Sequence, residues 1–241
     1  RTAPVVLDLP QFRVEAGERV FLKGASGSGK STLLGLIAGV MTPGAGRIEV
    51  LGTPVSTLSG GKRDAFRAER LGVIFQMFNL LPYMPAGANV MLPTRFSARR
   101  RKACAEAGGP EKEARRLMAR LQLDPERYWS SPPTALSVGQ QQRVAAARAL
   151  IGRPGLVLAD EPTSALDPEM IKEVLDAIRK LAGTGMTMIV VTHEMGFARE
   201  ICDKIVFMAD SRIVEVASPG EFFTAPKTDR AKDFLAKVLN H

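Results

Sequence analysis

The chain has 241 residues, of which 45% are hydrophobic and 24% charged, a composition typical of a globular protein with one large domain. No apolar run approaches the roughly 20 residues of a transmembrane helix, and the start lacks the pattern of a signal peptide, so we expect neither. Two widely spaced cysteines, Cys104 and Cys202, favour reduced thiols over a disulfide. Two histidines are too few for a multi-histidine metal site.

The net charge of +8 needs an explanation of its own. Basic residues are densest at 95–102 and 113–120. Charge alone leaves three interpretations open: binding of nucleic acid, contact with anionic lipid headgroups, or a solvated helical face.

Strand-like and helix-like segments alternate along the chain, which predicts an α/β fold with a mainly parallel sheet. Residues 19–24 are strand-like and run into a glycine-rich turn. Residues 31–39 have the pattern of a helix that ends at Gly39. Short strands are expected at 47–52 and 72–76.

The composition shifts at about 88–127 to arginine, alanine and glutamate with helical spacing. The GGP at 108–110 divides this region into two helices, and the SPP at 131–133 ends it. The later segments predict a helix at 135–150, a strand at 156–160, an amphipathic helix at 167–183, a strand at 186–193, a hairpin at 205–217 and a helix at 231–239. We therefore expect a single domain over residues 1–241, with an inserted helical subdomain at 88–150 and a small antiparallel β part.

A glycine-rich segment, GASGSGKST at 24–32, fits the phosphate-binding pattern G-x-x-x-x-G-K-[ST] between a strand and a helix. Its glycines let backbone amides turn toward phosphate oxygens, and the helix adds its positive dipole end. Lys30 would reach the terminal phosphates, and the Ser31 hydroxyl would coordinate Mg²⁺. The residues expected to hold ATP are Gly24, Ala25, Ser26, Gly27, Ser28, Gly29, Lys30, Ser31 and Thr32.

Two carboxylates, Asp160 and Glu161, follow directly after the apolar run at 156–159. Carboxylates at the edge of a core are costly unless a cation or a reactive group meets them. A metal bound to a triphosphate needs such a carboxylate, which Asp160 supplies. Glu161, on the other side of the extended chain, would then orient or deprotonate the attacking water.

With these residues placed, the chain resembles the ATP-binding subunit of ABC transporters over its whole length. Gln76 matches the Q-loop glutamine of that family, 136–143 (LSVGQQQR) its signature, 164–167 (SALD) its D-loop, and His193 its switch histidine. The resemblance implies an ATPase with Lys30, Gln76, Glu161 and His193 as the catalytic residues. It also implies a Mg²⁺ site formed by Ser31, Gln76 and Asp160.

The signature helix has Ser137 where a good N-cap is needed. In the family, two subunits pair head to tail, so the resemblance implies a homodimer or a paired ATPase subunit. Ser137, Gly139 and Gln140 of one subunit would face the ATP of the other, and Asp167 would relay between the sites. Integral membrane permease subunits are the other implied partners, with the chain cytoplasmic on the inner face of the bacterial membrane and touching it only through them. No nucleic acid partner is expected.

Two positions depart from the family pattern. Val138 stands where the family usually has glycine, close to the expected γ-phosphate. No aromatic residue precedes Phe12, so we expect the residue that stacks on adenine to lie upstream of Arg1 or to be absent.

The two halves of the chain resemble different branches of the family. Residues 69–93 and 135–150 are similar to ATPases of lipoprotein release, macrolide export and heterocyst-glycolipid export, whereas 167–200 and 221–239 are similar to polar amino-acid uptake ATPases. A recombined or engineered chimera would have this pattern, and so would an unusual natural relative. Because the family docks its membrane subunit through the Gln76 region and the helical subdomain, we favour export or lipoprotein release, with amino-acid uptake as the alternative.

Two other classes of function stay open. An ABC-type ATPase that works on DNA would suit the basic charge, but it carries a long coiled coil where this chain has short arginine-rich helices. A scaffold that binds ATP without hydrolysing it would suit Val138 and the missing aromatic residue, although Lys30, Glu161 and His193 are all present.

Overall fold

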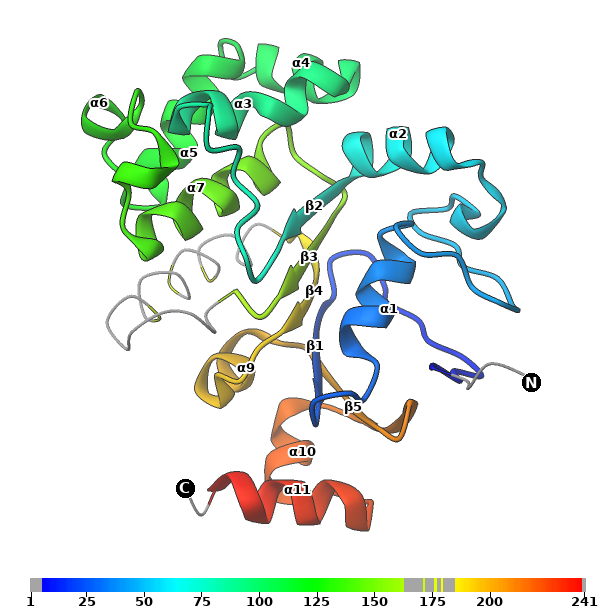
Figure 1. Ribbon diagram of the computed structural model, residues 1–241. Helices are drawn as coiled ribbons and strands as arrows, with labels where there is room; N and C mark the ends of the chain where they lie inside the picture. Colours follow the sequence, from blue (N-terminus) through cyan, green and yellow to red (C-terminus); the bar gives the residue numbers. More distant parts are fainter. Residues whose placement is uncertain (1–5, 163–170, 172–175, 177–178, 180–184, 240–241) are drawn as a thin grey trace.

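A computed structural model describes residues 6–162, 171, 176, 179 and 185–239 (Figure 1). In this part of the chain a sheet has the strand order β2-β3-β4-β1-β5-β6. The strands are β1 (Arg19–Gly24), β2 (Leu71–Ile74), β3 (Leu156–Asp160), β4 (Thr187–Val191), β5 (Lys204–Ala209) and β6 (Arg212–Ala217). All neighbouring strands are parallel except the hairpin β5–β6. The predicted mainly parallel α/β fold is therefore confirmed.

The central strands form because their apolar residues are buried on both faces, as parallel sheets require. Phe21 of β1 pairs with Val190 of β4, and Leu158 of β3 pairs with Ile189. Since these strands run in one direction, their carboxyl ends meet at one edge. This edge brings Gly24, Asp160 and the residues after Val191 together.

The two faces of the sheet are covered by different helices (Figure 1). On one face, Val20 and Leu22 of β1 pack with α1 (Lys30–Ile37) and α2 (Gly60–Arg70). Phe21 lies between them in sequence and therefore faces the other side, where it packs with the last three helices. The helices of this second face are α3 (Ala86–Phe96), α4 (Ala98–Ala105), α5 (Pro110–Arg120), α6 (Pro125–Tyr128), α7 (Val138–Leu150), α9 (Met195–Ile201), α10 (Pro219–Thr224) and α11 (Asp229–Leu239).

The helical segment differs from its prediction in one respect. The break at 108–110 is confirmed, but each side of it holds two helices rather than one. Before the break, α3 ends at Phe96, and the Ser97 hydroxyl accepts from the Arg100 amide to begin α4. This N-cap stabilises a new helix start where the composition shows only continuous helical character.

One predicted strand is wrong, and one helix was not predicted. The strand expected at 47–52 is absent from the described structure, where an isolated bridge joins Val50 and Thr53. Leu51 and Gly52 have positive φ angles of 51° and 75°, so the chain reverses there. Helix α2 was not predicted, because among its residues Phe66 alone is buried and no apolar period marks it. The helix predicted at 167–183 lies largely outside the described residues.

The basic segment at 95–102 is partly structural rather than a solvated face. Arg100 is 1% exposed, and its guanidinium donates to the carbonyls of Ala68 at 2.7 Å and Ile151 at 2.6 Å. Burial lowers the pKa of Arg100 to about 10. This side chain therefore joins α4 to the ends of α2 and α7.

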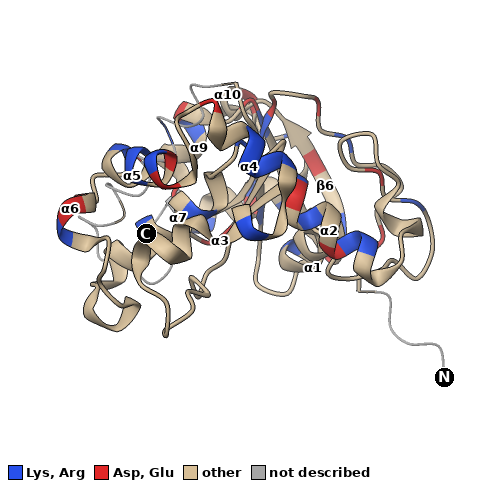
Figure 2. Ribbon diagram, turned by 90° about the horizontal axis from the view of Figure 1, so that it is seen from above, with Lys and Arg blue, Asp and Glu red and all other residues tan. Residues whose placement is uncertain are grey.

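The other charges are mixed in sign. Figure 2 shows basic and acidic residues interspersed on α5 and α6. Arg116 binds the buried Glu113 at 2.6 Å, and Arg115 contacts Glu111 and Glu126 at 3.0 Å each. None of the helices in the described part of the chain has the length and apolar character needed to cross a bilayer.

Candidate functional site

The glycine-rich loop after β1 has a shape that side chains would not allow. A Cβ on Gly24 would lie 2.2 Å from the carbonyl oxygen of Met208 on the neighbouring strand β5. Gly27 and Gly29 have φ angles of 78° and 96°, which glycine adopts without strain. Gly29 is the residue before α1, so the loop ends on the positive end of that helix.

Lys30 places a buried cation inside this loop. It is 8% exposed, and its Nζ donates to the carbonyls of Gly24 at 2.8 Å and Ala25 at 2.9 Å. Burial lowers the pKa of Lys30, while Glu161 and Asp160 oppose that effect. The hydroxyl of Ser28 is also buried and has no partner among the described residues. A cation, an unpaired hydroxyl donor and a helix N-terminus together fit a phosphate group.

Asp160 ends β3 beside the first turn of α1. Burial raises the pKa of its carboxyl group, and the nearby Ser31 hydroxyl opposes that effect. The described residues contain no cluster of three or more His, Cys, Asp or Glu side chains that could hold a metal by themselves. Ser31 and Asp160 instead offer two hard oxygens, which suits Mg²⁺ because this ion keeps waters and phosphate oxygens as its other ligands.

Gln76 follows the end of the neighbouring strand β2 and is not hydrogen-bonded to this oxygen pair in the described part of the chain. It is exposed, two residues beyond β2, and within the described structure no hydrogen bond joins it to Ser31 or Asp160. The structure therefore brings together Ser31 and Asp160 of the predicted Mg²⁺ site, with Gln76 outside hydrogen-bond reach.

Glu161 and His193 form a direct pair at the same edge of the sheet. Glu161 Oε1 lies 3.1 Å from His193 Nε2, and the two side chains are 23% and 63% exposed. The Glu161 amide donates to the Val191 carbonyl at 2.8 Å. The expectation that Glu161 continues an extended chain is wrong, because its φ of 45° is left-handed. This turn directs the carboxylate toward His193, two residues beyond β4.

The signature segment begins α7 as predicted. The Ser137 hydroxyl accepts from the Gln140 amide at 3.3 Å, and the Gln140 side chain accepts from the Ser137 amide at 2.9 Å. This capping box confirms Ser137 as the N-cap. Gly139 is buried, whereas Val138 is 41% exposed.

The signature does not join the phosphate loop of its own chain. Helix α7 packs on the face of the sheet opposite to α1 (Figure 1). The capped first turn of α7, with Ser137 and Gly139, therefore lies on a different face of the sheet from the helix that begins at Lys30. Asp167 and the rest of the expected D-loop lie outside the described residues.

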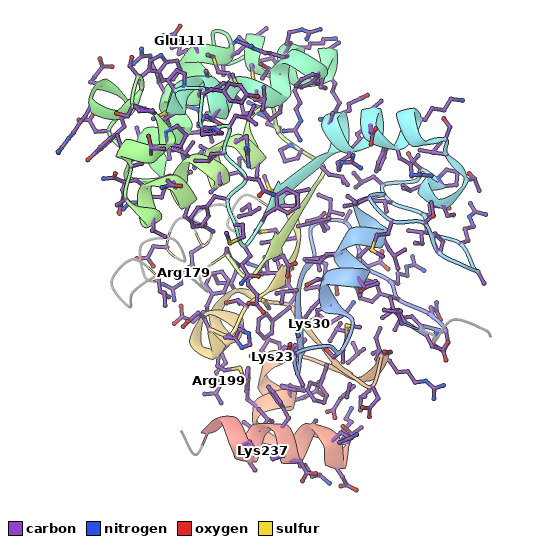
Figure 3. All side chains as sticks on the ribbon, in the orientation of Figure 1. Lys23, Lys30, Glu111, Arg179, Arg199 and Lys237 are labelled. Atoms are coloured by element: carbon purple, nitrogen blue, oxygen red, sulfur yellow. The ribbon has the colours of Figure 1, made fainter. Side chains whose placement is uncertain are left out.

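Three residues near the site were missed from sequence. Lys23 of β1 is buried, and its Nζ lies 3.5 Å from His193 Nδ1. Figure 3 labels Lys23 near Lys30 of the phosphate loop. Arg148 of α7 donates to the carbonyls of Phe78 and Asn79, which follow Gln76, at 2.6 Å each. The buried Gln142 side chain donates to the Pro162 carbonyl. The sequence signal for these residues was a polar side chain at a buried position of an apolar strand or helix. Such a signal does not reveal which group the side chain binds.

The first strand of the parallel sheet leads through an anion-binding glycine loop into a helix, and a carboxylate lies at the end of β3. These features define a P-loop nucleotide-binding protein. The model of the ABC transporter family matches residues 7–164, more than half of the chain, so the chain belongs to the ABC transporter family. It is accordingly a nucleotide-binding ATPase of that family.

Curated relatives match almost the whole chain. The glutamate transport ATP-binding protein GluA of Corynebacterium glutamicum is 47% identical, covering 95% of this chain and 91% of the relative. The glutamine transport ATP-binding protein GlnQ of Bacillus subtilis is 44% identical over 98% and 94%. The glutamate/aspartate import ATP-binding protein GltL of Escherichia coli is 46% identical over 94% and 90%.

A solved structure has the same fold. The ATP-binding cassette MJ0796, in a dimeric post-hydrolysis state bound to ADP and Pi, is 33% identical with a TM-score of 0.75, covering 86% of this chain and 88% of that one.

These relatives give no support to a difference between the two halves of the chain. Their matches cover 94–98% of the chain, at overall identities of 44–47%. The expected chimera and the preference for lipoprotein release rested on short segments, 69–93 and 135–150. Both segments contain motifs that the whole family needs, so they do not separate its branches.

Proposed function

We propose that this chain is the ATP-hydrolysing subunit of a polar amino-acid uptake transporter and acts as a head-to-tail dimer. The observation that carries the proposal is the near full-length identity of 42–47% to proteins whose names describe glutamate, glutamine and arginine transport. The geometry of the loop, the carboxylates and His193 supports ATP hydrolysis as its part in that process.

The phosphates of ATP bind the loop at 24–32. Lys30 exchanges its bonds to the Gly24 and Ala25 carbonyls for phosphate oxygens, and the buried Ser28 hydroxyl gains a partner. Ser31 and Asp160, with Gln76 after a movement of its loop, would hold Mg²⁺, which supplies charge neutralisation on the phosphates.

Glu161 and His193 act on the attacking water. Glu161 accepts the proton of the water. His193 Nε2, which lies 3.1 Å from Glu161 Oε1 in this structure, exchanges this contact for the γ-phosphate, so that the water can enter beside Glu161. Both residues leave the sheet at the same edge as the phosphate loop, which supports these roles.

The dimer supplies the remaining groups. Ser137, Gly139 and Gln140 lie on the opposite face from the loop of their own chain, so they reach the ATP of a partner copy, with Asp167 between the sites. Two dimeric structures of the cassette MJ0796, each with a TM-score of 0.75, support this arrangement.

The dimer drives a pair of integral permease subunits from the cytoplasmic side of the bacterial membrane. Helices within 88–150 form the inserted subdomain that docks them, together with the Gln76 loop. Arg100 supports a structural rather than a nucleic-acid role for the basic segment, since its guanidinium is buried against carbonyls.

The test is reconstitution in proteoliposomes with the permease subunits of the same transporter. We expect ATP-dependent uptake of glutamate or glutamine, abolished in Glu161→Gln. Uptake that does not respond to any polar amino acid, or ATPase activity stimulated by duplex DNA instead, would contradict the proposal.

A further inference from the structure

Lys23 is a buried cation that the proposed chemistry does not yet use. It lies in β1 immediately before the phosphate loop and is 3% exposed. Within the described residues, no carboxylate lies within ion-pair distance of its ammonium. A lysine at this depth is unusual unless it is paired, so its environment must be explained.

The groups around the ammonium come from three elements. Lys23 Nζ lies 3.5 Å from His193 Nδ1 and 3.5 Å from the Thr192 carbonyl. The ring centroid of Phe21 is 5.9 Å away and that of Phe234, in α11, is 5.5 Å away. The ammonium is thus held between two aromatic rings and directed at the histidine.

This arrangement determines which nitrogen of His193 carries the proton. An ammonium has three donors and no acceptor, so Nδ1 facing it must be the unprotonated nitrogen. The remaining proton is then on Nε2, the atom that lies 3.1 Å from Glu161 Oε1. Burial lowers the pKa of Lys23 to about 8, with Lys30 adding to this effect and Glu161 and Glu194 opposing it. Lys23 therefore remains mainly protonated near neutral pH.

We propose that Lys23 is a positioning residue that keeps His193 in the Nε2-protonated tautomer and turns that N–H toward Glu161 and the γ-phosphate. Phe234 shields the ammonium from water, so helix α11 takes part in holding the arrangement. The catalytic consequence rests on the proposed function of His193, whereas the tautomer itself does not.

The tautomer can be read directly by nitrogen NMR of the full chain labelled with ¹⁵N-histidine. The sequence has only two histidines, His193 and His241, and His241→Gln removes the second signal. With the imidazole in its neutral form, we expect the unsubstituted chain to show Nε2–H alone. Lys23→Met should show both tautomers, and Lys23→Arg, which keeps a donor, should restore the first pattern.

Turnover provides the second readout. Partners that orient a metal-ligating histidine are typically worth about 10–100-fold. By analogy, we expect kcat of Lys23→Met to fall by about tenfold with little change in KM for ATP, and Lys23→Arg to recover most of it. Thermal unfolding of both variants tests that they fold. An unchanged tautomer in folded Lys23→Met overturns this proposal. Unchanged turnover in His193→Ala overturns the proposed function of His193 instead, and leaves the tautomer result intact.

Discussion

Arg148 in α7 donates to the carbonyl of Asn79 at 2.6 Å and so joins the signature helix to the loop that carries Gln76. Phe78 and Asn79 both have φ of 49°, a left-handed conformation that asparagine tolerates but that costs a residue such as phenylalanine about 1 kcal/mol or more. The loop therefore depends on the guanidinium for its shape.

We expect Arg148→Met to loosen this loop and to destabilise the fold by about 2 kcal/mol, because two charge-assisted hydrogen bonds are lost. Hydrogen exchange should rise at 75–80 and remain unchanged in the core strands. Arg120→Met, at the exposed end of α5, is the matched control. Equal exchange in the two variants would contradict the role of Arg148.

The proposed base can be tested without changing the size of its side chain. Glu161→Gln keeps hydrogen bonding but removes basicity, so we expect turnover to fall by about 10²–10⁴-fold. The variant should still bind ATP and, with Mg-ATP, sediment as a dimer. Turnover similar to that of the unsubstituted chain would remove Glu161 from this role.

The dimer predicts a dependence on concentration. Because Ser137 and the phosphate loop lie on opposite faces of one chain, turnover per chain should fall on dilution of the isolated subunit. Ser137→Ala should lower turnover and leave binding of ATP to the monomer unchanged. A rate per chain that is independent of dilution would show that one chain is sufficient.

Gly24 tests the shape of the phosphate loop. In Gly24→Ala the new methyl group would lie 2.2 Å from the Met208 carbonyl, so β5 or the loop must shift. Overpacking of this kind costs about 1–3 kcal/mol, and we expect a lower Tm and weaker ATP binding. Gly44→Ala has open space around its Cβ and serves as the control. Equal melting of the two variants would contradict the predicted clash.

Lys23 makes stability depend on pH. Burial lowers its pKa from 10.5 to about 8. Between these values the unfolded chain binds a proton that the folded chain has released, so the free energy of unfolding rises with pH through this window. The full contribution is at most about 3 kcal/mol. Denaturant unfolding should show this rise relative to Lys23→Met; parallel pH profiles would argue against it.

The parts of the site that sequence predicted are those that depend on local geometry. The phosphate loop, the Ser137 cap and Asp160 at the end of β3 each follow from a short pattern with one backbone solution. Glu161 was placed in the right position but with the wrong direction, because its left-handed φ follows from pairing with Val191 on another strand.

The missed features depend on contacts between distant segments. Arg100 and Arg148 look like surface charges in a helical sequence, yet both donate to carbonyls more than twenty residues away. Helix α2 has too few buried residues to show a period, and the turn at Leu51 ended a segment of strand-like composition. Such contacts can be identified only from the folded structure, because the partners are far apart in the sequence.

The bond between the Gln142 side chain and the Pro162 carbonyl has a consequence for coordination of the two copies. Gln142 lies one turn beyond the capped end of α7, and Pro162 directly follows Glu161. If that capped end is displaced when it meets a neighbouring nucleotide, the shift is transmitted mechanically to the backbone beside the acid. In each copy, binding of α7 to the partner's nucleotide would then affect the position of that copy's own Glu161 at the other nucleotide site. Hydrolysis at the two sites would therefore become correlated in time.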